Sequence, residues 1–90
     1  MVESETLSSL EDVVAQLSIK LRYEKGDFQG GYCRIGNTKM LIINAGFDLQ
    51  RKVSLISKEL SKFDLSETFM VPAIRLLIEK NRTDHPQPEV

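Results

Sequence analysis

Three basic side chains, Arg51, Lys58 and Lys62, recur at intervals of seven and four residues. On a helix with 3.6 residues per turn, this spacing places them on one side. A basic stripe of this kind attracts negatively charged groups, and it is equally typical of an ordinary solvated helix face. The residue types and their spacing therefore favour binding over catalysis.

The helix that must position this stripe has the clearest periodic pattern in the chain. Its apolar residues follow at steps of four and three positions, which predicts one buried side. They are Leu49, Val53, Ile56, Leu60 and Phe63. Asp48 stands just before them and is a favourable N-cap, because its carboxylate can accept hydrogen bonds from free backbone N–H groups. We therefore expect a packing helix from Asp48 to Phe63, with the basic stripe opposite its buried side.

Periodicity and turn signals predict the remaining elements. The predicted order is a helix over residues 4–17 with Ser4 as its N-cap, strands over Ile19–Glu24, Tyr32–Ile35 and Thr38–Asn44, the helix described above, and a helix from Pro72 to Asn81. The pair Gly36-Asn37 tolerates positive φ and predicts a hairpin between the second and third strands. We predict an α+β fold of order α-β-β-β-α-α, with helices on one face of a three-stranded antiparallel sheet. Residues 1–81 would form one globular domain and residues 82–90 a disordered C-terminal tail.

The third strand ends in Ile42-Ile43-Asn44 before an arginine-containing helix, and on that helix Leu55-Ile56-Ser57 precedes Lys58-Glu59-Leu60-Ser61-Lys62. Together with the order of the elements, these two motifs resemble the ImmA/IrrE-type zinc metallopeptidases over residues 5–63. The helix of that family carries His-Glu-x-x-His after an apolar pair and a small residue. The resemblance thus implies that Glu59 stands at the position of the general base, while Lys58 and Lys62 replace the metal-binding histidines.

Two lysines at these positions argue against zinc catalysis. Lysine binds a metal only as the free amine, and its reference pKa of about 10.4 makes deprotonation at pH 7 cost about 4–5 kcal/mol for each side chain. Two such costs would consume most of the roughly 10–16 kcal/mol that a structural zinc site supplies. Without the metal, Glu59 has no activated water to deprotonate. We therefore expect a domain that is not an enzyme and needs no metal or other cofactor.

Size and composition indicate a small soluble domain. Ninety residues with 41% hydrophobic side chains suffice for one core. Cys33 is the single cysteine and cannot form an internal disulfide, which fits a reducing compartment. The acidic N-terminal region lacks the basic and apolar segments of a signal peptide. The longest apolar run, Met40 to Ile43, is too short to span a membrane. We expect a cytoplasmic protein without membrane contact.

The run Met40-Leu41-Ile42-Ile43 lacks the alternation of a strand with one solvated face. Such a strand must be covered on both faces, either because it is central in the sheet or because a partner covers the second face. We predict protein–protein contact there, by self-association as a homodimer or by capture of an extended peptide at the edge of this strand. The predicted interaction surface comprises Met40, Leu41, Ile42, Ile43, Arg51, Lys58 and Lys62.

A basic sheet face is the alternative binding site. Lys20 and Arg22 share the polar face of the first strand, and Arg34 and Lys39 would join them from the neighbouring strands. With a tyrosine nearby, such a surface suits phosphates and a stacked base of a nucleic acid. The low isoelectric point, about 5.8, and the lack of an aromatic-rich strand signature argue against a nucleic-acid binder. This alternative remains open beside the protein-contact prediction.

Overall fold

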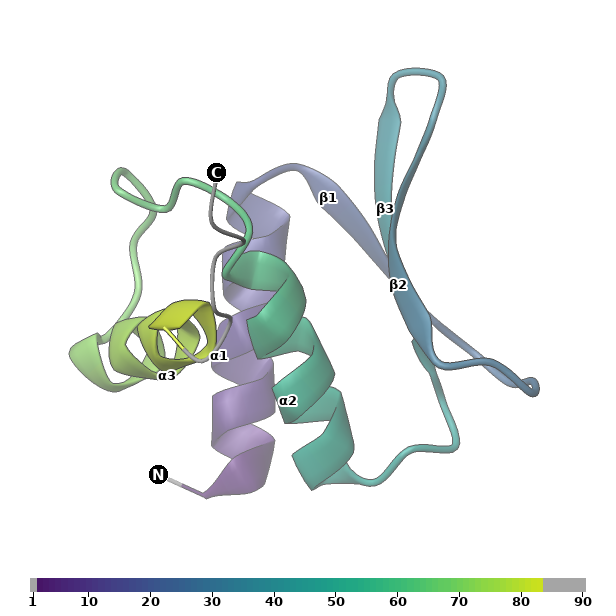
Figure 1. Cartoon of the computed structure of the whole chain (residues 1–90), viewed down its shortest axis with the longest axis horizontal. Helices are drawn as coiled ribbons and strands as arrows, with labels where there is room; N and C mark the ends of the chain where they lie inside the picture. The colour runs from purple at the N-terminus through teal and green to yellow at the C-terminus, as the bar shows by residue number, and fades with distance from the viewer. Residues whose placement is uncertain (1, 84–90) are drawn as a thin grey trace.

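The computed structural model describes residues 2–83 as one α+β fold (Figure 1). Its elements in chain order are α1 (Glu3–Gln16), β1 (Ile19–Glu24), β2 (Gly30–Ile35), β3 (Thr38–Asn44), α2 (Leu49–Leu60) and α3 (Pro72–Thr83). The predicted order is confirmed, and β1 and β3 have the predicted bounds. The N-cap of α1 is Val2, without a side-chain hydrogen bond, so the prediction of Ser4 as the cap is wrong.

The sheet is mixed, with β3 between β1 and β2. The hairpin pairs β2 antiparallel to β3 as predicted, and Gly36 in its turn has a positive φ of 61°. β1 instead runs parallel to β3, with Leu21 beside Leu41, so the prediction of a purely antiparallel sheet is wrong. Pairing in sequence order would have left the apolar run of β3 at an edge. The mixed order places it at the centre, where both of its edges are hydrogen-bonded.

All three helices lie on the same side of the sheet (Figure 1). Side chains alternate along a strand, and the two faces of β3 differ accordingly. Leu41 and Ile43 point towards the helices and are fully buried, whereas Met40 and Ile42 point the other way and are partly buried. The predicted arrangement of helices on one face is therefore confirmed.

The core lies between the sheet and α1, α2 and α3. Its fully buried members are Leu10, Val13, Val14, Leu41, Ile43, Ile56, Leu60, Ile74 and Ile78. Asp48 caps α2 as predicted, since its carboxylate accepts a hydrogen bond from the Arg51 N–H at 2.9 Å. Leu49 is an exception to the predicted buried side, because the first turn of α2 leaves it 40% exposed.

The end of α3 holds the end of α2 in place. The guanidinium group of Arg82 donates to the backbone oxygens of Ser61 and Phe63, each at 2.8 Å, and also pairs with Glu79. Because of these contacts Arg82 belongs to the folded domain, and α3 continues two residues past its predicted end. The rest of the predicted disordered tail, residues 84–90, lies outside the described residues.

The chain passes over the end of β3 on its way from β1 to β2, and Asn44 fixes this crossing. The side-chain nitrogen of Asn44 donates to the backbone oxygens of Gly26 at 2.9 Å and Phe28 at 2.5 Å. Its side-chain oxygen accepts from the Gly46 N–H at 2.8 Å. One buried amide therefore joins the crossing loop, the end of β3 and the turn that leads into α2.

Ser57 is a polar residue in the apolar interior. It is fully buried on α2, and its hydroxyl has no hydrogen-bond partner among the described residues. Burying an unpaired hydroxyl lowers stability. We expect Ser57→Ala to raise the free energy of unfolding by about 1 kcal/mol, measured by urea denaturation. The matched change Ser54→Ala, at an exposed position of the same helix, should alter it by less than about 0.5 kcal/mol. A loss of stability in Ser57→Ala would show that the hydroxyl is paired in solution.

None of the three helices within residues 2–83 is long and apolar enough to cross a membrane.

Candidate functional site

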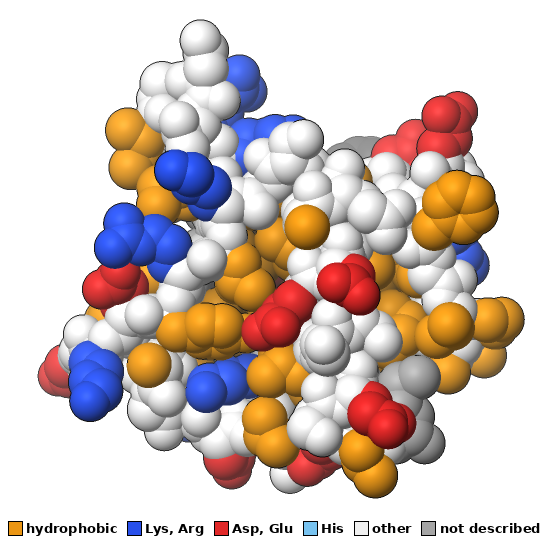
Figure 2. Space-filling model, turned by 180° about the vertical axis from the view of Figure 1, so that it is seen from behind, with side chains coloured by type: hydrophobic (Ala, Val, Ile, Leu, Met, Phe, Trp, Pro, Cys, Tyr) orange, Lys and Arg blue, Asp and Glu red, His pale blue; other side chains and the backbone are white. Residues whose placement is uncertain are grey.

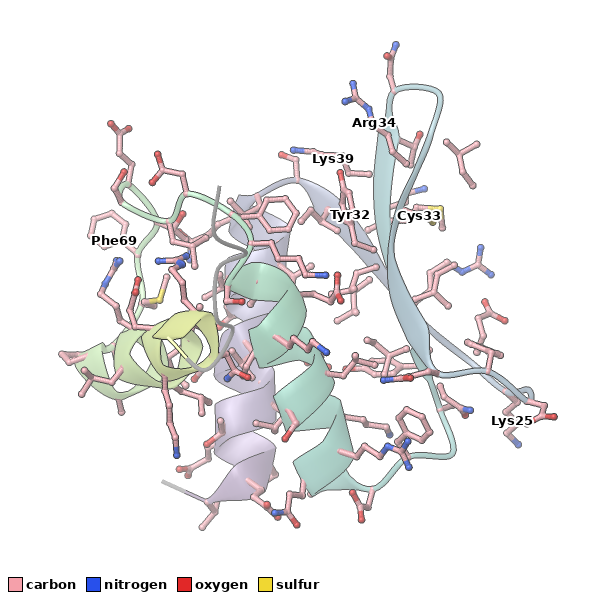
Figure 3. All side chains as sticks on the ribbon, in the orientation of Figure 1. Lys25, Tyr32, Cys33, Arg34, Lys39 and Phe69 are labelled. Atoms are coloured by element: carbon pink, nitrogen blue, oxygen red, sulfur yellow. The ribbon has the colours of Figure 1, made fainter. Side chains whose placement is uncertain are left out.

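The face of the sheet opposite the helices is the first candidate site. The side chains directed to this open face are Lys20, Arg22 and Glu24 of β1, Met40 and Ile42 of β3, and Cys33 and Ile35 of β2, as the strand registers require. Figure 3 shows Cys33 on this face, while Tyr32, Arg34 and Lys39 point to the helix side. No helix within residues 2–83 covers these side chains, so the open face is accessible to a partner.

The open face has an apolar centre and a charged border. Met40 lies opposite Cys33 on the neighbouring strand, and Ile42 lies opposite Gly31. A shallow hollow of about 550 Å³ extends from there to the loop after β1. Its lining includes Phe28, Ile42, Gly31 and Cys33, together with Glu24 and Lys25. On β1, the carboxylate of Glu24 is 2.6 Å from the guanidinium of Arg22, and the two charges offset each other. Lys20 carries the remaining positive charge that β1 presents on the open face.

The predicted interaction surface is divided between three locations. Met40 and Ile42 are on the open face, whereas Leu41 and Ile43 are buried against the helices and cannot contact a partner. The basic residues Arg51 and Lys58 lie on α2, whereas Lys62 lies in the turn that follows the end of this helix at Leu60. The prediction that all seven residues form one surface is therefore wrong. Because both edges of β3 are already paired, this strand also cannot capture an extended peptide.

The four residues of the predicted basic sheet face do not share a face. Lys20 and Arg22 are on the open face. Arg34 and Lys39 occupy opposite positions on the neighbouring strands β2 and β3, and both side chains are on the helix side. The ammonium group of Lys39 donates to the backbone oxygen of Leu17 at 2.8 Å. The sequence does not fix which residues of neighbouring strands share a face, because that depends on the register between the strands. The observed register instead places Arg34 on the same side as Tyr32, whose ring packs edge-on against Phe63 at 5.3 Å between centroids.

The outer side of α2 borders a second hollow of about 220 Å³. Its lining residues are Gln29, Phe47, Arg51, Ser54, Leu55, Lys58 and Asn81. The Arg51 guanidinium lies 4.2 Å from the centre of the Phe47 ring, a cation–π contact that holds the arginine beside the helix. The hollow therefore brings together two of the three residues of the predicted basic stripe, Arg51 and Lys58.

The segment that resembles a metallopeptidase helix has an internal ion pair. Glu59 is largely buried, with 9% of its surface exposed, and its carboxylate accepts a hydrogen bond from Lys62 at 3.2 Å. Lys58 is exposed. Within residues 2–83, no group of three or more histidine, cysteine, aspartate and glutamate residues is arranged to hold a metal ion. The arrangement suits a structural ion pair at the margin of the core.

Tyr23 links the sheet to α1. Its hydroxyl donates to the Glu11 carboxylate at 2.5 Å, and the Lys52 ammonium lies 5.1 Å from the centre of its ring. Partial burial raises the pKa of the Tyr23 hydroxyl above its usual value, and the hydrogen bond to Glu11 adds a smaller increase. The raised pKa keeps this hydroxyl protonated and donating, so Tyr23 acts in the fold and has no feature of a catalytic acid.

The comparisons with known proteins add no relative. No protein-family model, no curated protein and no solved structure matches the chain. Structure and sequence therefore define the class of fold, an α+β domain with a mixed three-stranded sheet, and the candidate sites rest on the geometry above.

Proposed function

We propose that this protein is a non-catalytic domain that acts through protein–protein contact, and that a second copy of the chain covers the open face of its sheet. The observation that carries the proposal is the parallel pairing of β1 with β3. Sheets of parallel strands are almost always covered on both faces, and their strands are continuous apolar runs like that of β3. In this mixed sheet, Met40 and Ile42 of that run lie on a face that no element within residues 2–83 covers. A partner supplies the missing layer.

Charge favours a second copy as that partner. Lys20 and Glu24 lie at opposite ends of the open side of β1. If two copies pack face to face with their strands antiparallel about a two-fold axis, Lys20 of one copy approaches Glu24 of the other at both ends of the contact. The same symmetry places Ile42 against Ile42 at the centre, and beside it Arg22 against Arg22, whose charge is offset by the Glu24 carboxylate 2.6 Å away on the same strand. A two-fold contact of this kind is self-complementary and closes as a dimer.

The contacts of α2 support the absence of catalysis in this proposal. The carboxylate of Glu59 is paired with Lys62 and largely withdrawn from solvent, so it is poorly placed to act on a substrate. We propose that any kinship with the ImmA/IrrE-type metallopeptidases is one of fold without hydrolysis. The single cysteine fits a cytoplasmic location for such a domain.

Sedimentation velocity of matched lysine variants tests the proposal. We expect the wild-type protein to sediment as a dimer at tens of micromolar, a range typical of modest interfaces. Ile42→Lys should sediment as a monomer, because it buries a charge at the centre of the contact. Leu76→Lys, a matched change at an exposed apolar residue of α3, should remain dimeric.

Circular dichroism must show native helix content in each variant, and Met40→Lys serves if Ile42→Lys does not fold. A wild-type protein that stays monomeric at these concentrations would contradict self-association. A dimer that survives both open-face variants would place the contact elsewhere.

A further inference from the structure

Phe69 is the most exposed large apolar side chain in residues 2–83, with 88% of its surface accessible. It lies in the segment between α2 and α3, and Figure 3 shows it on the far side of the helices from the sheet. Val71 and Leu76 are 48% and 70% exposed. Figure 2 shows apolar side chains gathered over this segment and α3. This apolar patch is thus separate from the open face of the sheet.

The backbone that carries the Phe69 ring is held by a side chain from α1. The amide nitrogen of Gln16 donates to the Phe69 backbone oxygen at 2.7 Å, and the Phe69 N–H donates to the Gln16 side-chain oxygen at 2.9 Å. One glutamine therefore satisfies both backbone polar groups of Phe69, across 53 positions of sequence. The backbone is fixed although the ring itself contacts little of the protein.

The rest of the segment is fixed from α3. The Arg75 guanidinium donates to the backbone oxygens of Leu65 at 3.2 Å and Thr68 at 2.8 Å. The Thr68 N–H in turn donates to the Leu65 backbone oxygen at 3.1 Å. Leu65 is buried in the core. Hydrogen bonds from α1 and α3, together with the burial of Leu65, thus tie this short loop to the rest of the fold.

An aromatic ring on a fixed backbone is suited to binding. Ordering a flexible loop costs free energy when a partner binds, and a loop that is already ordered avoids that cost. Aromatic side chains, phenylalanine among them, are enriched at the buried centres of protein interfaces. From this geometry we infer that Phe69, flanked by Val71 and Leu76, is an anchor that inserts into an apolar pocket rimmed by lysine or arginine on a different protein.

Acidic residues around Phe69 indicate that the rim of the partner's pocket is basic. Asp64 and Glu67 lie on the same loop. Asp12 is one turn before Gln16 on α1, and so lies on the side of that helix which faces the loop. Hydrogen bonds from Ser66, chiefly from its backbone N–H, hold the pKa of the Asp64 carboxyl below its usual value, so it stays charged. The nearby cation Arg75 is directed to the loop's own backbone oxygens.

The same acids make a second copy of the chain an unfavourable occupant. A two-fold contact through Phe69 would bring Asp64 and Glu67 of both copies together, and like charges across an interface are costly. Lys80 lies at the far end of the patch, one turn beyond Leu76. At that distance its positive charge is largely screened and offsets little of the negative charge near the Phe69 ring. Charge therefore favours a basic, apolar partner over self-association at this surface.

Selection from a phage-displayed library of a small folded domain with randomised surface loops tests the anchor, because such a domain can form a pocket. Domains selected on the wild-type protein should bind through a surface rich in apolar residues and in lysine or arginine. Their affinity for Phe69→Ala should fall by about thirtyfold or more, as at an interface hot spot. Gln16→Ala keeps the ring but frees its backbone, so affinity should fall by about threefold to tenfold. Gln50→Ala, an exposed glutamine on α2, is the matched control and should not change affinity.

Several outcomes would overturn the inference. These are a selection that yields no binding domain dependent on Phe69, selected binding surfaces that are predominantly acidic, and binding that Phe69→Ala leaves unchanged. A change in the sedimentation of the protein caused by Phe69→Ala would also overturn it, because the occupant would then be a second copy. None of these results depends on the open face of the sheet, so the inference and the proposed function can fail separately.

Discussion

Gly30→Ala is expected to lower the free energy of unfolding by at least about 3 kcal/mol. Gly30 begins β2 with a φ of +107°, a conformation that residues with a side chain rarely adopt. A Cβ at this position would lie 2.2 Å from the backbone oxygen of Ile42 and 3.1 Å from the Cα of Ile43. Both atoms belong to the central strand, so neither can move without breaking the sheet.

Gly31→Ala provides the matched control for this experiment. Gly31 also has a positive φ, +153°, but a Cβ there would meet nothing within 4 Å. We expect its cost to be near 1 kcal/mol, from backbone conformation without the clash. Urea denaturation of both variants measures the difference. Equal effects of the two substitutions would contradict the close approach of β2 to β3 at Gly30.

Loss of the Asn44 side chain is expected to have the second large effect. Asn44→Ala removes three hydrogen bonds and leaves the backbone oxygens of Gly26 and Phe28 without their donor, which should cost about 2–4 kcal/mol. Asn44→Asp should cost at least as much near pH 7, because a carboxylate oxygen would then face two backbone oxygens. The measurement is the free energy of unfolding in urea.

The pH dependence of Asn44→Asp separates hydrogen bonding from packing. Protonation of the new carboxyl restores a donor, so this variant should recover part of its stability relative to wild type as the pH falls towards about 4. Asn37→Asp, in the exposed hairpin turn, is the control and should not show such a recovery. An Asn44→Ala variant within about 0.5 kcal/mol of wild type would contradict the role of Asn44 in the crossing.

Much of the fold could be predicted because its elements follow local patterns. The spacing of apolar residues from Val53 to Leu60 predicts α2, and Asp48 predicts its start. Alternation in β1 and the turn at Gly36 predict the strands and the hairpin. These signals depend only on residues close together in sequence, and the structure contains the helix, strands and hairpin that they predict.

Strand order could not be predicted in the same way. Whether β1 pairs with β2 or with β3 depends on contacts between distant residues, such as the hydrogen bonds of Asn44 to the crossing loop. The apolar run in β3 indicated a strand covered on both faces. Its central position pairs both of its edges, but the face that carries Met40 and Ile42 stays uncovered within residues 2–83. The parallel register of β1 with β3 places Lys20 beside Met40 and Lys39 beside Ile19, so the two lysines point to opposite faces of the sheet.

The candidate sites were predictable only in part. The basic stripe on α2 follows from helix periodicity, and Arg51 and Lys58 do line one hollow. The sequence indicated Phe69 only as apolar surface available to a partner and not as an exposed anchor, because a lone phenylalanine in a loop is usually buried. Its exposure depends on Gln16, which lies far away in sequence and gives it a fixed backbone without covering the ring.

Intermolecular nuclear Overhauser effects in a mixture of isotope-labelled and unlabelled protein test the central claim most directly. If two copies pack through the open face of the sheet, the methyl groups of Met40 and Ile42 should show contacts to protons of the other copy. The methyl groups of Val71 and Leu76 should show none. Intermolecular contacts from Val71 or Leu76, with none from Met40 and Ile42, would contradict self-association through this face.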